Sequence, residues 1–264
     1  MIMAERELGP ASAIVGGKTI ELTIEDSKAT LYLPDSWNKT SSHLWVHFHS
    51  APWYVVSEYN RAGNTEPVLI FNLGQGSTVY AKPFLNKGVF SKWLTLAQQE
   101  SGMAETWSAV SLTSFSAGYG AVRQIVQESE ILDRLKTVIL GDSLYASLDS
   151  AQPGRKVLKE HLDVWAPLAK RAMEGKTTWI ISTSQITPES YAGTWEVAMQ
   201  LVESLGGQML PADENEPATK QKPQSLARTY SKGRWFVWSY EGDTPVAHMT
   251  HARRLAEMII ESKK

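Results

Sequence analysis

Residues 109–120 read AVSLTSFSAGYG. This stretch predicts a strand, a sharp turn and a helix in succession, and the other predicted elements lie before and after it in the sequence. It begins with an apolar run typical of a buried strand and passes directly into a helical pattern. Ser116 stands at the junction, with Ser114 two residues before it and Gly118 two residues after it. A turn this sharp strains the backbone of its central residue and needs small neighbours, so that strand and helix can approach. The stretch therefore predicts a turn that lifts the Ser116 hydroxyl above a sheet.

Short apolar runs on both sides of this turn predict the other strands. Lys18–Ile24 and Ala29–Leu33 flank a turn-like segment at residues 25–27, which favours an antiparallel hairpin. Runs that are apolar along their whole length suit strands buried on both faces of a mostly parallel sheet. These runs are His43–Phe48, Val68–Phe71, Ser108–Thr113, Thr137–Leu140, Thr178–Ser182 and Trp235–Tyr240.

Helical spacing of apolar residues appears between these runs. The expected helices are Val89–Glu100, Ala117–Glu128, Lys156–Met173, Thr194–Leu205 and Thr250–Ile260. A hairpin followed by alternating strands and helices and a closing helix predicts an α/β fold. We expect a doubly wound, mostly parallel sheet with an antiparallel N-terminal hairpin, formed by a single domain over residues 1–264.

Composition narrows the possible partners. The chain has 264 residues, with 26 basic and 28 acidic side chains and a net charge of −2. It contains no long run of either sign, so we expect neither a nucleic acid nor an anionic membrane as a partner. The absence of cysteine excludes disulfides, thiolate metal sites and cysteine nucleophiles. No stretch has the ~18–20 uninterrupted apolar residues that a membrane span needs.

The N-terminal sequence MIMAERELGPASAIVGG contains acidic residues and no apolar core of signal-peptide length. We therefore expect a cytoplasmic protein, or a secreted one whose export signal has been removed. Nothing in the sequence predicts the oligomeric state.

With the Ser116 turn after the fifth strand, the chain resembles the α/β-hydrolase superfamily, in particular its serine esterases and lipases, over nearly its whole length. Members of this superfamily are mostly ester and amide hydrolases that use a serine–histidine–acid triad. The resemblance implies that Ser116 is the nucleophile. The backbone N–H of Ala117 would then point at the oxyanion that develops during attack. The motif here is S-x-S-x-G, whereas the family more often has G-x-S-x-G.

A second oxyanion donor is expected after the third strand. Relatives often carry His-Gly-x-Pro in this loop, and His49-Ser50-Ala51-Pro52 matches except that Ser50 replaces glycine. Ala51 is then the donor, and Ser50 must accept a tight backbone that glycine adopts more easily. His47 and His49 share a strand face, but no third ligand stands nearby, so we expect no metal. The Gly74–Gly76 pair is too sparse for a phosphate or dinucleotide fingerprint, and we expect no cofactor. His49 is expected to shape the loop and His47 to be a core residue.

The general base of this family comes late in the chain, before the closing helix. Residues 239–259 read SYEGDTPVAHMTHARRLAEMI, and we expect His248 to be the base because a loop imidazole can reach over the sheet edge. His251, in the first turn of the expected helix, would support His248 or bind substrate.

The position of the triad acid differs from the commoner pattern of this family. It usually follows the seventh strand, but Ser184 stands at about that place and no carboxylate is near it. A minority of the superfamily carries the acid after the sixth strand, where Asp142 follows Thr137–Leu140 directly. Asp142 is therefore the expected acid, because it can orient a histidine from this position. Asp243, Glu189 and an acidless Ser–His pair remain as alternatives.

Loops leaving the C-terminal strand ends supply the pocket of such a fold. We expect substrate contacts from Trp53, Tyr54, Gln75, Tyr119 and Tyr145, and a lid from the insertion at residues 143–177. The predicted function is a serine hydrolase that acts on a small-molecule carboxylic ester through an acyl-enzyme. Amidase, peptidase and thioesterase activities stay open. The alternative is a non-catalytic small-molecule binding protein of the same fold.

Overall fold

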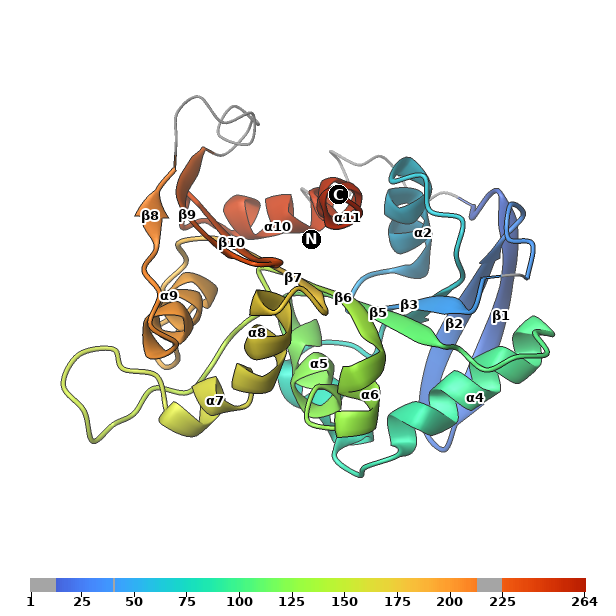
Figure 1. Ribbon diagram of the computed structural model, residues 1–264, viewed down its shortest axis with the longest axis horizontal. Coiled ribbons are helices and arrows are strands. Elements are labelled where there is room, and N and C mark those ends of the chain that lie inside the picture. The colour runs from blue at the N-terminus through green and yellow to red at the C-terminus, as the bar shows by residue number, and fades with distance from the viewer. Residues whose placement is uncertain (1–12, 40, 213–224) are drawn as a thin grey trace. The chain divides into compact units, whose positions relative to one another are not determined.

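The computed structural model describes residues 13–39, 41–212 and 225–264 (Figure 1). The chain forms two compact units, of which the first contains Met1–Val138 and Leu255–Lys264 and the second contains Ile139–Arg254. The division falls inside strand β6 (Leu135–Gly141), so each unit contains part of it. The expectation about an export signal concerns residues 1–12, which lie outside the described part.

The first unit contains the N-terminal hairpin and a set of parallel strands. Its strand order is β1-β2-β4-β3-β5, followed by the start of β6. The hairpin β1–β2 is antiparallel, and β3 runs parallel to both β4 and β5. Because β4 and β5 are buried along their whole length, their sequences are continuously apolar or small. The bounds are β1 Gly17–Ile24, β2 Ser27–Pro34, β3 His43–Phe48, β4 Val68–Phe71 and β5 Ala109–Phe115.

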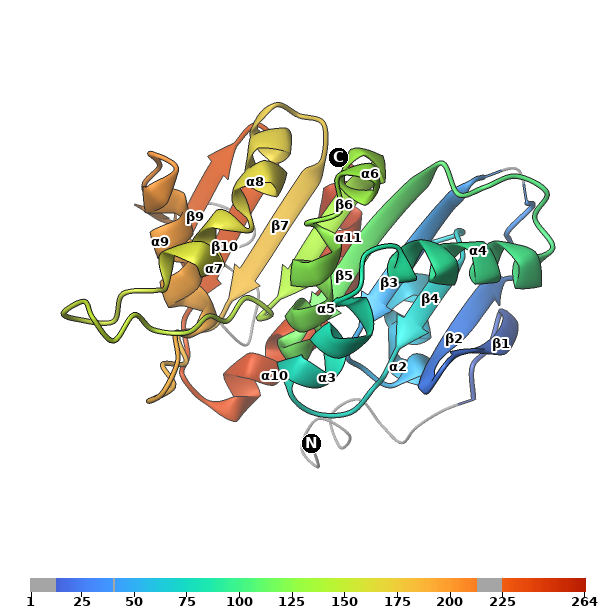
Figure 2. The ribbon, with the colours of Figure 1, turned by 90° about the horizontal axis from the view of Figure 1, so that it is seen from below.

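Helices cover both faces of these strands (Figure 2). Helices α2 and α11 lie on one face, where the Glu58 carboxylate accepts the Ala256 N–H at 3.3 Å. Helices α3 to α6 lie on the other face. The bounds are α2 Pro52–Arg61, α3 Ser77–Ala81, α4 Val89–Ser101, α5 Tyr119–Ile125, α6 Ser129–Arg134 and α11 Leu255–Ser262, with 3-10 turns η1 Lys82–Phe84 and η2 Ser116–Gly118.

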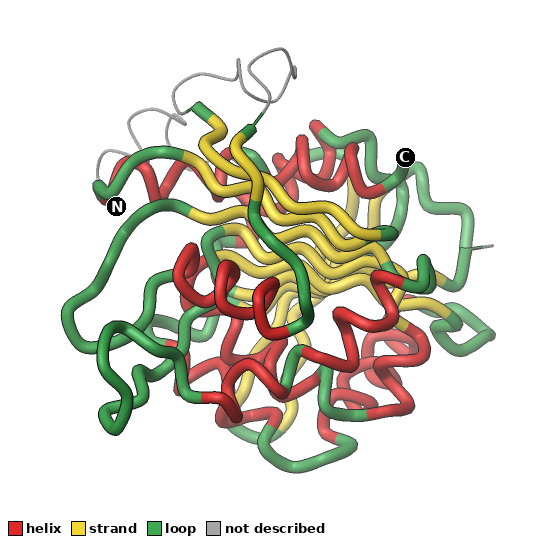
Figure 3. Tube along the Cα trace, turned by 60° about the vertical axis from the view of Figure 1, so that its left-hand side comes forward, coloured by secondary structure: helices red, strands yellow, loops and turns green. Residues whose placement is uncertain are grey.

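The second unit continues from the end of β6 in the order β7-β10-β9-β8. Strand β10 is parallel to β7 and antiparallel to β9, and neighbouring strands twist relative to one another (Figure 3). Helices α7, α8 and α9 lie on one face of these strands and α10 lies on the other (Figure 1). The bounds are β7 Thr178–Thr183, β8 Leu210–Pro211, β9 Leu226–Lys232, β10 Trp235–Tyr240, α7 Lys159–Asp163, α8 Ala166–Met173, α9 Thr194–Ser204 and α10 Pro245–Arg253.

Three helix predictions are wrong in their bounds. The expected helix over Ala117–Glu128 is a 3-10 turn followed by the shorter α5, Tyr119–Ile125. The expected helix over Lys156–Met173 is two helices, because Pro167 lacks an N–H and fits only the first turn of α8. The expected helix over Thr250–Ile260 is also two, and the first begins earlier, at Pro245. Thr244 caps that helix by accepting the Ala247 N–H at 3.2 Å, which is a signal the sequence contains.

Aromatic side chains fill the core of each unit. In the second unit Trp165, Trp179 and Trp235 stack in a row, with ring centroids 5.8 and 5.2 Å apart. In the first unit Trp93 packs edge-on against Phe71, with centroids 4.9 Å apart. Six of the ten tryptophans are buried in this way and contribute to packing. Across residues 13–39, 41–212 and 225–264, every helix is too short or too polar to cross a bilayer.

Candidate active site

Ser116 lies in strained backbone at the end of β5. Its φ is 49°, a value in the left-handed region that serine rarely adopts. The turn is tight because Gly118 lies against the end of β3, where an added Cβ would stand 2.4 Å from the Phe48 carbonyl oxygen. A Cβ added at Gly120 would lie even closer to backbone, 2.1 Å from the Ser77 carbonyl oxygen. The turn has the small neighbours and the strained centre that the sequence motif predicts.

The loop after β3 is shaped by His49. The positive φ of this loop falls on His49, at 72°, and not on Ser50, so the expected cost of replacing glycine at position 50 does not arise. His49 Nδ1 lies 2.8 Å from the Tyr80 hydroxyl, and the imidazole stacks on Phe115. The Tyr80 hydroxyl also donates to the Gly74 carbonyl at 3.1 Å. His49 and Tyr80 therefore connect the loops that follow β3 and β4.

His47 is a core residue with a hydrogen-bond partner. It is buried, and its Nδ1 lies 2.8 Å from the Thr113 hydroxyl on the neighbouring strand. Burial lowers its pKa to about 3, so the imidazole is neutral at pH 7. In the described part of the chain, no three His, Asp or Glu side chains are grouped so that they could hold a metal ion.

Ala51 and Ala117 both stand where a helix begins. Ala51 is the N-cap of α2, and Ala117 lies in the 3-10 turn that leads into α5. Backbone N–H groups at the start of a helix have no carbonyl partner inside that helix, and the helix dipole makes this end electropositive. Both amides belong to the first unit, as does Ser116.

Asp142 is the most strongly hydrogen-bonded carboxylate of the candidate site. It is fully buried at the end of β6 with a φ of 43°. Its Oδ1 accepts the Ser184 N–H at 2.9 Å and the Thr194 hydroxyl. Its Oδ2 accepts the Ser184 hydroxyl at 2.7 Å and lies 2.6 Å from Nδ1 of His248. Ser184, at the place after β7 where the sequence analysis looks first for an acid, donates to the carboxylate at the end of the adjacent strand.

These contacts fix the charge of Asp142. Burial alone would raise its pKa, but the neighbouring His251 and His248 and the Ser184 amide together hold that pKa well below its ordinary value. The carboxylate is therefore ionised at neutral pH. An ionised carboxylate on Nδ1 orients the imidazole and leaves proton transfer to Nε2.

The structure corrects the position expected for His248. The sequence places it on a loop ahead of the closing helix, but it lies within α10, in the second turn, because Thr244 and Pro245 start that helix early. The side chain is 19% exposed. Asp243 and Glu189, the alternative acids, are both exposed, whereas Asp142 makes the contact with His248. His248 is thus held by a helix on one side and by Asp142 on the other.

His251 lies one turn further along α10 and is fully buried. Its Nδ1 is 2.5 Å from the Ser182 hydroxyl on β7, and its ring contacts Tyr240 edge-on. Burial lowers its pKa to about 4 against the opposing effect of Asp142, so the imidazole is neutral at pH 7. Of the two roles considered for His251, a buried ring fits the supporting one.

The residues expected to contact substrate are divided between the two units. Trp53 and Tyr54 lie in the first turn of α2, the former half-buried and the latter buried. Gln75 is exposed, and Tyr119 is buried with its hydroxyl 3.2 Å from Ser77 Oγ. Tyr145 belongs to the second unit, where its ring packs edge-on against Tyr191 with centroids 5.7 Å apart.

Sequence reasoning missed Thr194. Its hydroxyl reaches Asp142 from the first residue of α9, and it is buried. The sequence Gly193-Thr194 before a helical pattern was the available signal, because a hydroxyl in a first helical turn often bonds to a polar neighbour.

No family model matches the sequence, and no curated protein sequence matches it. Solved structures do. A ferulic acid esterase is 11% identical, with 93% of this chain and 98% of that chain covered and a TM-score of 0.53. Carboxyl esterase 2 from the mycorrhizal fungus Tuber melanosporum is 13% identical, covering 97% and 88%, with a TM-score of 0.51. A hyperthermophilic esterase from the archaeon Pyrobaculum calidifontis is 11% identical, covering 99% and 90%, with a TM-score of 0.51.

At these identities the similarity concerns the fold. The protein has the α/β-hydrolase fold, with a mostly parallel sheet, an antiparallel N-terminal hairpin and flanking helices. The fold class predicted from the sequence is confirmed.

Proposed function

We propose that the protein is a serine hydrolase of small-molecule carboxylic esters, with Ser116 as nucleophile, His248 as general base and Asp142 as acid. The observation that carries the proposal is the buried, ionised Asp142 carboxylate at 2.6 Å from His248 Nδ1. A buried charge of this kind is costly, and a carboxylate oriented on an imidazole is the arrangement that activates a hydroxyl nucleophile. The esterase structures with the same fold support the reaction class.

The proposed reaction proceeds in two halves. Ser116 Oγ attacks the ester carbonyl while His248 Nε2 takes its proton, and the resulting oxyanion is bound by the N–H groups of Ala51 and Ala117. The imidazolium then protonates the departing alcohol, and a water molecule hydrolyses the acyl-enzyme by the same steps. The proposal requires that Ser116 of the first unit and His248 of the second act on one substrate.

The strained backbone at Ser116 supports its role as the nucleophile. A serine at a φ of 49° costs on the order of 1–3 kcal/mol, and such strain is retained mainly where a side chain must be presented in one direction. We propose that Trp53, Tyr54, Gln75, Tyr119 and Tyr145 contact the substrate. Of the insertion at residues 143–177, α8 packs in the core of the second unit, so we propose a lid only from residues 143–158.

A fluorophosphonate probe tests the proposal because it labels only an activated serine. We expect one label per chain on the wild-type protein and none on Ser116→Ala. A series of p-nitrophenyl esters of increasing acyl length then defines the acyl group that is accepted. A folded wild-type protein that takes no label and hydrolyses none of these esters would instead be the non-catalytic binding protein.

A further inference from the structure

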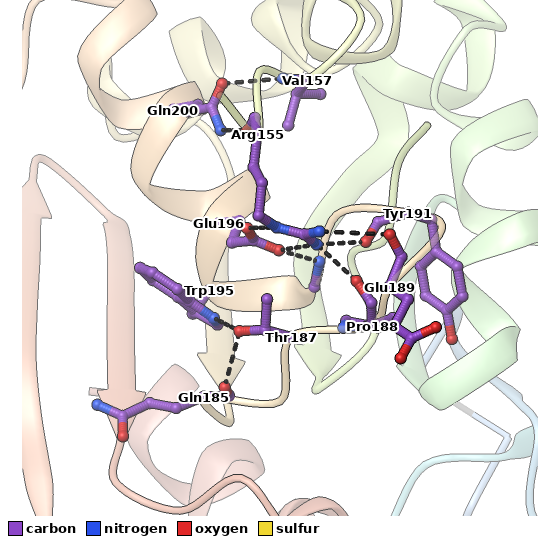
Figure 4. Close-up of polar contacts among 11 residues, drawn as sticks. Arg155, Val157, Gln185, Thr187, Pro188, Glu189, Tyr191, Trp195, Glu196 and Gln200 are labelled. Carbon is purple, nitrogen blue, oxygen red and sulfur yellow. Dashed lines mark hydrogen bonds and ion pairs between the residues drawn. The ribbon is translucent and has the colours of Figure 1, made fainter. Parts of the chain in front are cut away.

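Arg155 lies at the centre of a polar cluster in the second unit (Figure 4). Its Nε is 2.5 Å from Glu196 Oε1 and its second guanidinium nitrogen is 2.9 Å from Oε2, so the pair is bidentate. The same guanidinium donates to the Pro188 and Tyr191 carbonyls, each at 2.7 Å. A planar guanidinium with several donors suits such a junction, because lysine cannot make the same set of contacts.

Glu196 connects this cluster to the start of α9. Its side chain is only 5% exposed, and Oε2 accepts the Gly193 N–H at 2.7 Å. Gly193 is itself pressed against the preceding loop, because an added Cβ would lie 2.1 Å from the Ile186 carbonyl oxygen. The Glu196 carboxylate therefore fixes the first turn of α9 against residues 185–193, and Arg155 neutralises its charge.

A second contact strengthens the anchor one turn further along α9. The Gln200 side chain donates to the Arg155 carbonyl at 2.9 Å and accepts the Val157 N–H at 3.0 Å. The excursion that leaves β6 at Asp142 is thus tied back to α9 at two successive turns.

The first turn of α9 is also where Asp142 is held. Thr194, the first residue of α9, donates its hydroxyl to Asp142 Oδ1, while the other carboxylate oxygen faces His248 Nδ1. The electropositive N-terminus of a helix adds to the stabilisation of an ionised carboxylate there. A shift of this turn by a few tenths of an ångström would change how Asp142 presents Oδ2 to His248.

We infer that Arg155 and Glu196 are a positioning pair, which holds the first turn of α9 so that Thr194 keeps Asp142 oriented on His248. Without Arg155 the Glu196 carboxylate would be buried and uncompensated, and the turn that it fixes would rearrange. The pair acts through Thr194 and Asp142, so we call it a positioning pair and not a catalytic one. Its importance for turnover rests on the proposed function, but its effect on the Asp142–His248 contact does not.

The test compares four variants with a matched control. Arg155→Met removes the ion pair, and Arg155→Lys keeps the positive charge but cannot make the bidentate contact with Glu196. Thr194→Val removes the hydroxyl and keeps nearly the same side-chain volume, and Thr194→Ser keeps the hydroxyl. Lys159→Met is the control, because Lys159 pairs with Asp163 at 2.5 Å on the surface of the same segment, with the lysine side chain 82% exposed. Each variant is checked for folding by circular dichroism.

The first measurement is the low-field proton resonance of His248 Nδ1–H, which reports the hydrogen bond to Asp142 and needs no substrate. We expect it to move upfield or broaden in Arg155→Met and Thr194→Val, and to persist in Thr194→Ser and Lys159→Met. The second is ester hydrolysis, where kcat should fall about tenfold to a hundredfold in Arg155→Met and Thr194→Val with KM little changed. Arg155→Lys should recover part of that loss.

An unchanged resonance in both Arg155→Met and Thr194→Val would overturn the inference. If Arg155→Met does not fold, the inference is tested with Thr194→Val, Thr194→Ser and Arg155→Lys. An Arg155→Lys protein with the wild-type resonance and rate would show that the bidentate contact of the guanidinium with Glu196 is not needed. A wild-type protein without hydrolysis or labelling but with the expected resonance changes would reject the proposed function and leave the positioning role standing.

Discussion

Ser116 combines a strained backbone with a hydroxyl at the junction of β5 and η2. Replacing it by alanine removes the proposed nucleophile and leaves the chain conformation nearly the same. We expect Ser116→Ala to lower kcat for an ester substrate by about 10⁴–10⁶, as for serine nucleophiles elsewhere. Stopped-flow or steady-state hydrolysis measures the loss, and the thermal unfolding midpoint checks the fold. A folded variant that retains most of its kcat would rule out Ser116 as the nucleophile.

Asp142 receives contacts from Ser184, Thr194 and His248, and each of them favours an ionised carboxylate. Asparagine at this place has one oxygen in place of two and cannot stabilise an imidazolium. We therefore expect Asp142→Asn to lower kcat by about 10³–10⁴. Asp243→Asn is the matched control, since Asp243 is exposed and was one of the alternatives for the same role. Equal losses in the two variants, or a larger loss at Asp243, would contradict the assignment.

At the scale of elements, each strand with a continuous apolar run was predicted, with bounds that match or differ by one or two residues, as for Ser108–Thr113 against β5. The expected bounds of His43–Phe48, Val68–Phe71 and Trp235–Tyr240 are the observed ones. Strands β8 and β9 were not predicted, because β9 alternates buried with exposed polar residues and β8 has two residues. Such edge strands depend on pairing with a neighbour more than on their own sequence.

The candidate site was predictable where one element carries its own signal. The Ser116 turn follows from its local motif. The pairing of Asp142 with His248 was expected from the family resemblance, with Asp243 and Glu189 left open as alternatives. The early start of α10 has a local signal in Thr244 and Pro245 that periodicity alone overlooks. Contacts such as Thr194 to Asp142 join residues 52 positions apart, and no local pattern specifies them.

The close approach of η2 to β3 makes Gly118 a sensitive position. Because a Cβ there would lie 2.4 Å from the Phe48 carbonyl oxygen, Gly118→Ala must displace backbone. We expect the free energy of unfolding of the first unit to fall by about 2–3 kcal/mol, as for other overpacked sites. Gly63→Ala is the control, since it has a φ of 62° but open space and should cost only about 1 kcal/mol. The φ of Gly118 is −59°, so only the steric clash acts there. Urea unfolding compares the two variants, and a cost at Gly118 no larger than that at Gly63 would contradict the predicted clash.

At the scale of the whole molecule, each unit contains a fully buried neutral histidine. The pKa is lowered to about 3 for His47 in the first unit and to about 4 for His251 in the second. In the unfolded chain both imidazoles bind a proton near pH 6.5. Between pH 6.5 and 4 the unfolded chain therefore holds more protons, and the folded state loses stability as the pH falls.

We expect the free energy of unfolding to drop by up to about 1.4 kcal/mol per pH unit for each of these histidines below pH 6. Asp142 does not contribute to the pH dependence in this range. Because its pKa is lowered in the folded state, the ionised carboxylate stabilises the fold above about pH 4, and this stabilisation is lost only at lower pH. Urea midpoints at pH 7 and pH 5 measure the effect. His251→Gln should reduce the pH dependence of the second unit, and a variant with the wild-type dependence would contradict the assignment.

The hydrogen bond between Ser184 and Asp142 has an evolutionary consequence. The two side chains come from neighbouring strand ends, and the serine oxygen is 2.7 Å from the carboxylate oxygen that faces His248. An ancestor carrying the acid at either position could therefore have moved it to the other through an intermediate with both carboxylates sharing one proton. Neither step would require a chain without an acid. The exchanged variant Asp142→Ser with Ser184→Asp tests whether the carboxylate can act from either strand end.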